Sequence, residues 1–301
     1  MTSLRYVITF VLGCMSAASA WQQAKAQAPE KLPVVATFSI LADLTRNVGG
    51  DRIEVTALVG PNGDAHVYQP KPADAKQLGA ARLILVNGLG LEGWIDRLIK
   101  ASGTTAPVIV AAKGITLQKM HEEGRIGPDP HAWQSIANAK IYVANIRDAL
   151  IGVDPGYASA YRANAENYTG ELDELDKDVR TEIAKIPPER RQIITTHDAF
   201  GYFGTAYGFR FIAPEGVSTE TEASARDVAK IIRQIKASNI PAVFLENVTD
   251  PRLVRTIASE SGAKIGGTLY SDALSLAGGP AATYIDMMRN NIRELSAALV
   301  N

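Results

Sequence analysis

The sequence predicts an α/β protein with two lobes, each built on a mostly parallel sheet that is flanked by helices. Three observations support this fold class. Apolar runs of strand length alternate with amphipathic runs of helix length, this pattern occurs twice, and one long helical segment separates the two copies. The 301 residues, 46% of them hydrophobic and 21% charged, are enough for two packed cores.

The N-terminal segment, residues 1–28, is predicted to be a signal peptide. An arginine precedes the apolar run Tyr6–Leu12, and two Ala-x-Ala cleavage motifs follow it. The run is shorter than the roughly 20 residues that a membrane-spanning helix needs, so we expect a protein of the periplasm. Cys14, the only cysteine, lies inside this segment. A lipid anchor through Cys14 is the less favoured alternative, because Leu12 fits a lipoprotein motif poorly.

Residues 29–154 are predicted to form the N-terminal lobe. Its strand-like runs are PVVATF, IEVTALV, LILVN and VIVAA, and its helix-like runs are ILADLTRNV, ADAKQLGAA and WIDRLIKA. Strands and helices that alternate in this way are typical of a parallel sheet with crossover helices.

Residues 155–186 are predicted to form one connecting helix of about 28 residues, or about 42 Å. Apolar side chains recur at steps of three and four at Tyr161, Ala165, Tyr168, Leu172, Leu175, Val179 and Ile183. Pro155 marks the start of the segment and two prolines follow its end. A coiled-coil partner would need the same stripe, but we favour a helix that lies across both lobes.

Residues 187–301 are predicted to form the C-terminal lobe. Its strand-like runs are QIITT, FRFIA, AVFLE and KIGGTLY, and its helix-like runs are FGYFGTAYG, SARDVAKIIRQIKA, PRLVRTIASES and a closing helix from about Pro280. The net charge of −1 carries interspersed signs, which argues against a nucleic-acid partner.

Residues 88–93, GLGLEG, match the GxGxxG pattern of dinucleotide-binding sites. The match follows the third strand-like run of its lobe rather than the first, and no acidic residue ends the next strand-like run. We therefore favour a tight turn with Trp94 packed behind it.

Four side chains that could hold a metal follow strand-like runs, two in each lobe: His66, His131, His197 and Asp272. Ligands bind at the carboxyl ends of strands in open α/β sheets, so these side chains would meet if the two lobes face each other. Three imidazoles and one carboxylate suit a divalent transition metal, and tetrahedral zinc best. Asp64 and Asp129 each stand two residues before a histidine, where they either orient the imidazole or only shape the turn.

Five segments together resemble the metal-specific solute-binding proteins of ABC importers: GDAHVYQPKPAD, NGLGLEGW, DPHAW, TTHDAFGYF and GGTLYSDAL. The resemblance covers essentially the whole mature chain. It implies two α/β lobes joined by a long helix, with His66, His131, His197 and Asp272 as metal ligands in the cleft between them. It also implies a periplasmic binding protein, not an enzyme, whose partner is a membrane permease.

The cargo that the resemblance implies is Zn²⁺. Manganese-type members are similar but carry Glu where this chain has His197, and an added nitrogen ligand favours Zn²⁺ over Mn²⁺. Mn²⁺ or Fe²⁺ is the alternative cargo, because GGTLYSDAL resembles the manganese and iron branch. His121 lies where many zinc-type members have a long histidine-rich loop, and we favour a solvated loop there over a metal-collecting one. We expect a monomer, and a periplasmic metallochaperone is left open as a further partner.

Two other function classes are less well supported by the sequence. A secreted zinc hydrolase would need an open coordination position and a base such as Glu220, Glu222 or Glu246, but a fourth protein ligand closes the site and the sequence contains no HExxH motif. A surface adhesin is the third class, and genetic context would distinguish it from a transport protein.

Overall fold

The structure is a computed structural model that describes residues 30–122, 125–216, 218–220 and 223–300. Lys31–Asn301 form one compact unit. The predicted signal peptide, including Cys14, lies outside the described residues. Within the described residues, no helix is both long enough and apolar enough to cross a membrane.

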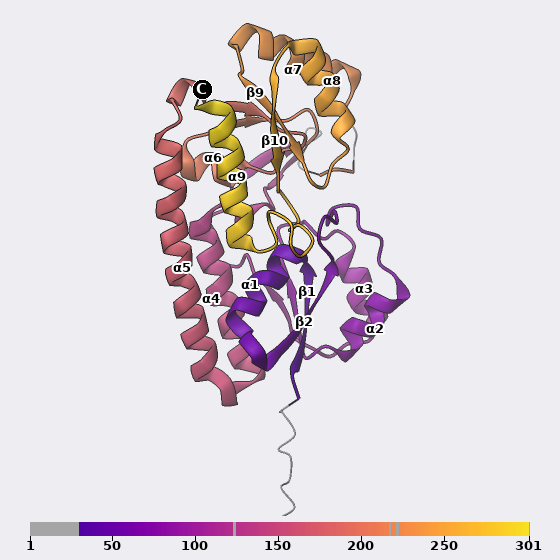
Figure 1. The fold of residues 1–301 in the computed structure, drawn as a ribbon. Helices are drawn as coiled ribbons and strands as arrows, with labels where there is room; N and C mark the ends of the chain where they lie inside the picture. The colour runs from indigo at the N-terminus through magenta and orange to yellow at the C-terminus, as the bar shows by residue number, and fades with distance from the viewer. Residues whose placement is uncertain (1–29, 123–124, 217, 221–222, 301) are drawn as a thin grey trace, which may run out of the picture. The chain divides into compact units, whose positions relative to one another are not determined.

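The N-terminal lobe is a four-stranded parallel sheet with the strand order β2-β1-β3-β4. Its elements are β1 (Leu32–Phe38), α1 (Ser39–Gly49), β2 (Ile53–Val59), α2 (Pro72–Ala80), β3 (Leu83–Val86), α3 (Ile95–Ser102), β4 (Val108–Val110) and α4 (Ile136–Val153). In Figure 1, α2 and α3 lie on one side of this sheet and α1 and α4 on the other. The strands β1 and β3 are buried almost throughout, as the centre of a covered parallel sheet requires.

The C-terminal lobe repeats this plan with the strand order β10-β9-β7-β8, again all parallel. Its elements are β7 (Gln192–Ile194), α6 (Gly201–Tyr207), β8 (Arg210–Ile212), α7 (Ala225–Ser238), β9 (Ala242–Glu246), α8 (Pro251–Ser261), β10 (Lys264–Leu269) and α9 (Tyr284–Leu299). Figure 1 shows α7 and α8 on one side of this sheet and α9 on the other. Two α/β lobes with parallel sheets confirm the predicted fold class.

The long helix α5 (Ala158–Ala184) connects the lobes over 27 residues. It packs against α1 and α4 of the first lobe and against α9 of the second. All seven residues of its predicted apolar stripe are buried. The apolar stripe is therefore buried by other parts of the same chain, as expected for a helix that lies across both lobes.

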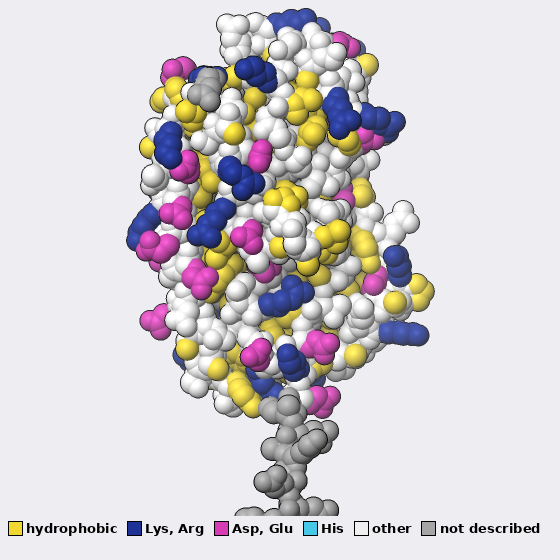
Figure 2. Space-filling view, in the orientation of Figure 1, with side chains coloured by type: hydrophobic (Ala, Val, Ile, Leu, Met, Phe, Trp, Pro, Cys, Tyr) yellow, Lys and Arg dark blue, Asp and Glu magenta, His cyan; other side chains and the backbone are white. Residues whose placement is uncertain are grey.

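Short 3-10 turns complete the fold: η1 (Gly50–Arg52), η2 (Ala132–Gln134), η3 (Pro155–Tyr157) and η4 (Pro188–Arg190). The turns η3 and η4 flank α5, so the regular α-helix starts after Pro155 rather than at it. Figure 2 shows acidic and basic side chains interspersed over the face in view, without a broad basic patch there.

Three features differ from the sequence prediction. The helix α4 was not predicted, although its buried residues recur at steps of three and four. The segment around His121 was expected to be a loop, but its backbone forms the antiparallel hairpin β5 (Lys119–Glu122) and β6 (Arg125–Pro128). The closing helix begins at Tyr284 rather than near Pro280, because the hydroxyl of Thr283 caps it by accepting the N–H of Asp286 at 3.1 Å.

Candidate metal centre

The structure brings together all four side chains that the sequence analysis singled out. One nitrogen or oxygen atom from each of His66, His131, His197 and Asp272 lies within 4.8 Å of those of the other three. His131, His197 and Asp272 are fully buried, and His66 is 7% exposed. The group is thus withdrawn from water, and His66 forms its most accessible side.

Loops from both lobes carry these residues to one point. His66 follows β2, and His131 follows the hairpin strand β6 rather than β4 directly. In the second lobe, His197 follows β7 and Asp272 follows β10. Each lobe therefore contributes two side chains, so the arrangement of the centre depends on how closely the lobes approach each other.

The separations suit a small cation. The Nε2 atoms of His66 and His131 lie 3.1 Å apart. Oδ2 of Asp272 lies 3.2 Å from Nε2 of His66 and 3.1 Å from Nε2 of His197. Ligands bound about 2.0–2.1 Å from a tetrahedral Zn²⁺ would lie about 3.4 Å from one another. These three separations are close to that value, and all the separations among the four ligand atoms are within 4.8 Å.

One carboxylate oxygen of Asp272, Oδ1, is shielded from water. Among the described residues, no hydrogen bond reaches its buried Oδ1 atom. Nε2 of His131 lies 3.6 Å from this oxygen. Buried polar atoms are rarely left without a partner, and a bound cation would supply one.

The charges of the centre depend on one another. Burial lowers the pKa of His131, but the carboxylates of Asp272 and Asp129 outweigh burial and raise this pKa to about 9. Burial likewise opposes the shift at His197, yet Glu246 and Asp272 raise its pKa well above the usual range. The pKa of Asp272 would rise on burial, but His197 and His131 hold it well below the usual range. A cation that binds here replaces imidazolium protons.

Asp129 orients His131. Its Oδ1 atom lies 2.9 Å from Nδ1 of the ring and also accepts the backbone N–H of His131 at 2.9 Å. A proton held on Nδ1 leaves the lone pair of Nε2 directed at the centre. Both alternatives considered for Asp129 therefore apply, because it shapes the turn and positions the ring.

Asp64 has a different role. One carboxylate oxygen accepts the backbone N–H of His66 at 2.8 Å, and the other accepts the hydroxyl of Thr219 at 2.5 Å. Asp64 thus shapes the turn that carries His66 and links it to the second lobe.

Glu246 was considered in the sequence only as a base for a hydrolase. In the structure its Oε2 atom lies 2.6 Å from Nδ1 of His197, without the alignment of a hydrogen bond. Its Oε1 atom accepts the backbone N–H groups of Thr196 and His197 at 2.7 and 3.0 Å. Glu246 ends the strand β9, so the carboxyl-end rule that selected the other residues could have found it. Glu220, a second candidate base, is exposed, and Glu222 lies outside the described residues.

The glycine-rich segment forms a tight turn that supports the centre. Gly88 and Gly90 have φ angles of 82° and 87°, in the left-handed region that favours glycine. The carboxylate of buried Glu92 accepts the N–H of Gly88 at 3.2 Å. Behind the turn, Nε1 of Trp94 donates to the carbonyl oxygen of Ala65, next to His66, at 2.8 Å. The segment thus holds a ligand loop in place, as the tight-turn interpretation expects.

Two donors from the first lobe reach the loop that carries Asp272. Nε1 of Trp133 and Nε2 of Gln134 donate to the carbonyl oxygen of Ser271 at 2.9 and 2.7 Å. Trp133 and Gln134 follow His131, and Ser271 precedes Asp272. Two side chains that follow His131 are therefore bonded directly to the backbone that precedes Asp272 in the opposite lobe.

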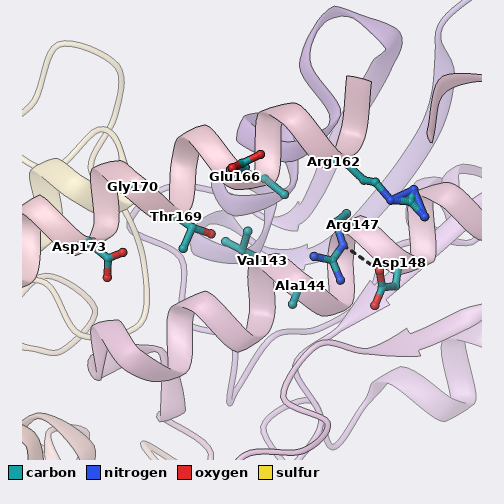
Figure 3. A pocket seen from close by; sticks show the side chains of 10 residues that line it. Val143, Ala144, Arg147, Asp148, Arg162, Glu166, Thr169, Gly170 and Asp173 are labelled. Atoms are coloured by element: carbon teal, nitrogen blue, oxygen red, sulfur yellow. Dashed lines mark hydrogen bonds and ion pairs between the residues drawn. The ribbon is translucent and has the colours of Figure 1, made fainter. Parts of the chain in front are cut away.

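A surface groove lies elsewhere on the molecule. A hollow of about 650 Å³ between α4 and α5 contains Arg147, Asp148, Arg162 and Glu166 (Figure 3). Nε of Arg147 donates to Asp148 at 2.8 Å, and none of the four converging residues lines the hollow. A second cavity of about 410 Å³ is lined by Asp64 and Thr219 and so adjoins the His66 side of the centre.

Comparisons with known proteins agree with this geometry. Residues 34–298 match the family model described as the periplasmic component A of a zinc-uptake complex. The chain is 37% identical over 263 residues to the manganese-binding lipoprotein MntA of Halalkalibacterium halodurans, covering 87% of each chain. It is 35% identical over 264 residues to the iron-binding protein YfeA of Yersinia pestis, covering 87% of this chain and 85% of that one.

Solved structures of periplasmic metal-binding proteins also match this chain. The periplasmic zinc-binding protein TroA of Treponema pallidum matches with a TM-score of 0.85 and 33% identity, covering 90% of this chain and all of that one. A Mn-bound periplasmic metal-binding protein of Candidatus Liberibacter asiaticus matches with a TM-score of 0.80 and 33% identity, covering 89% of this chain and 98% of that one.

Proposed function

The chain belongs to the family of periplasmic zinc-uptake components, the metal-binding proteins of ABC importers, and from this premise we propose that its cargo is Zn²⁺. Proteins of this family bind a solute and are not enzymes. They work with a membrane permease and its ATPase. For this chain we propose that His66, His131, His197 and Asp272 hold the ion between the lobes until the protein docks on its permease.

The convergence of three Nε2 atoms and one carboxylate within 4.8 Å supports this proposal. Three nitrogen ligands and one oxygen ligand match the preference of Zn²⁺ and are less suited to Mn²⁺, which favours oxygen. A hydrolase would keep one coordination position open for water, whereas we propose that Asp272 takes the fourth position here.

Mn²⁺ is the second candidate cargo. It is favoured by the name of one relative, the manganese-binding lipoprotein MntA, and by the Mn-bound solved structure. YfeA, which is named for iron, extends the choice to Fe²⁺. Affinity alone does not decide between these ions, because most nitrogen and oxygen sites bind Zn²⁺ more tightly than Mn²⁺ or Fe²⁺.

The deciding experiment is metal analysis of the purified protein, followed by competitive titration with Zn²⁺, Mn²⁺ and Fe²⁺. We expect the isolated protein to contain zinc, and a bacterial strain without it to grow poorly only when zinc is scarce. A protein that is isolated with manganese, in a strain whose growth defect manganese alone relieves, would refute the zinc assignment.

The way in which the metal ion is released depends on which lobe supplies each ligand. Because each lobe supplies two of them, a small separation of the lobes or the opening of one loop weakens binding. We propose that the His66 loop opens first, since His66 is the least buried of the four ligands and its neighbour Asp64 bonds to Thr219 of the other lobe. His131 is fully buried and braced by Asp129. We expect the continuous helix α5 to restrict the lobes to small movements.

The remaining assignments are proposals of the same kind. We propose export to the periplasm with removal of residues 1–28, lobes at residues 29–154 and 187–301, a connecting segment at residues 155–186, and a monomeric protein. MntA is named a lipoprotein, so attachment to lipid through Cys14 is the alternative to a free periplasmic form. A metallochaperone that loads the site, and metal capture by His121, both stay open to experiment.

A further inference from the structure

Glu246 is a buried carboxylate beside the centre that the proposed function leaves without a role. It is 4% exposed and lies on the side of His197 that faces away from the other ligands. We propose that Glu246 is a positioning residue that acts through His197 and sets how tightly the centre holds its divalent cation. The inference rests on the proposed function, since it concerns the same site.

The sheet places Glu246 between the two ligands of its lobe. In the strand order β10-β9-β7-β8, β9 lies between the strand before Asp272 and the strand before His197. Glu246 is the last residue of β9 and pairs with Leu269 of β10. The strand β9 thus provides no ligand. It ends in a carboxylate that reaches the loop after β7, which carries His197.

The contacts fix both the loop and the ring of His197. Oε1 of Glu246 accepts the backbone N–H groups of Thr196 and His197. Oε2 faces Nδ1 of His197 at 2.6 Å and has no hydrogen-bond donor among the described residues. A carboxylate at this distance keeps a proton on Nδ1, so that Nε2, which lies 3.1 Å from Oδ2 of Asp272, is the ring nitrogen left to bind a cation.

The first lobe contains a related arrangement, in which one carboxylate oxygen hydrogen-bonds to both the backbone and the ring of a histidine. Asp129 accepts the backbone N–H of His131 and also faces Nδ1 of its ring. Each lobe therefore supplies one imidazole that is backed by its own carboxylate, whereas Asp64 bonds to the backbone of His66. An imidazole that donates to a carboxylate is a stronger metal ligand, and loss of such a partner typically weakens metal binding about 10- to 100-fold.

The test compares Glu246→Gln with the wild-type protein after metal removal, with Glu260→Gln as the control. Glu260 is an exposed residue of α8 in the same lobe. Chelator competition gives the affinity for Zn²⁺ and, separately, for Mn²⁺. We expect Glu246→Gln to bind about 10- to 100-fold more weakly and Glu260→Gln to bind as the wild type does.

A spectroscopic measurement separates positioning from a structural role. The visible absorption of bound Co²⁺ reports the geometry and donor strength of its ligands, so we expect Glu246→Gln to shift and weaken the Co²⁺ bands. A purely structural role predicts a lower unfolding temperature with unchanged Co²⁺ bands and unchanged affinity. That result would overturn the inference.

A second variant covers the case in which Glu246→Gln does not fold. Glu246→Asp keeps the charge but shortens the side chain, and we expect an intermediate loss of affinity with a shifted Co²⁺ spectrum. Wild-type affinity together with a wild-type spectrum in this variant would also refute the inference. Each result is a ratio to the wild type for the same ion, so a protein that carries Mn²⁺ would refute the zinc assignment and leave this test intact.

Discussion

Nε2 of His197 lies 3.1 Å from Oδ2 of Asp272, although the two residues are 75 positions apart and both are fully buried. Burial opposes both shifts, yet Glu246 and Asp272 raise the pKa of His197, and His197 and His131 lower that of Asp272. The two residues form a buried ion pair whose charges offset each other. A divalent cation that binds here displaces the imidazolium protons.

Replacement of Asp272 by alanine should abolish tight metal binding. The change removes the only carboxylate among the four converging residues, and we expect the loss to exceed the roughly 100-fold upper range for groups that only support a ligand. Chelator competition with Zn²⁺ measures the effect. Asp148→Ala, which removes an exposed carboxylate of α4, should bind as the wild type does. Unchanged affinity in Asp272→Ala would exclude this residue as a ligand.

Trp133 and Gln134 should be coupled in their effect on stability. Both donate to the buried carbonyl oxygen of Ser271, so Trp133→Phe and Gln134→Leu each leave it one donor. The double variant leaves the carbonyl oxygen with neither. We expect the free energy of unfolding of the double variant to fall by about 1–3 kcal/mol more than the sum of the single losses. Urea unfolding of the four metal-free proteins measures this, and additive losses would contradict it.

Much of the fold could be predicted because its local patterns agree with its tertiary structure. Strand-like and helix-like runs alternate twice, and the stripe from Tyr161 to Ile183 on α5 is buried over its whole length. The helix α4 was not predicted, although its buried apolar residues also recur at steps of three and four. The hairpin around His121 is different, because its strands are short and charged and their pairing depends on contacts that a local pattern does not record.

The sequence predicts which residues form the candidate site, but it does not predict the contacts that support them. His66, His131, His197 and Asp272 all follow strands, and the carboxyl-end rule needs only the order of elements. The contact between Glu246 and His197 depends on β9 lying between β7 and β10, and strand order cannot be read from one sequence. The same limit applies to the bonds that Trp133 and Gln134 make across the lobes.

The stability of the metal-free protein should depend on pH through Asp43. This residue of α1 accepts the backbone N–H of Tyr284, at the start of α9, at 2.8 Å. Burial raises its pKa from 3.8 to about 6, against the lowering effects of that N–H and of Arg46. Between these values the folded protein binds more protons than the unfolded chain, so stability falls as the pH rises from about 4 to about 6.

The Asp43→Asn variant lacks this titration. Its free energy of unfolding, relative to the wild type, should increase between pH 4 and pH 7 by on the order of 3 kcal/mol, at 1.36 kcal/mol per pKa unit. Urea unfolding with a chelator present measures both proteins without a contribution from bound metal. Parallel pH profiles for the two proteins would show that Asp43 does not carry the effect.

Removal of the metal should destabilise the protein by an amount that the ion concentration sets. An ion at 1,000 times its dissociation constant stabilises the native state by about 4 kcal/mol if it does not bind the unfolded chain. For a protein of this size, that corresponds to an unfolding temperature about 10 °C higher. Thermal unfolding with Zn²⁺ and with excess chelator measures the difference. His131→Ala removes a fully buried imidazole of the centre, so its unfolding temperature should not respond to Zn²⁺. An equal response in His131→Ala and the wild type would mean that Zn²⁺ stabilises the fold from another site.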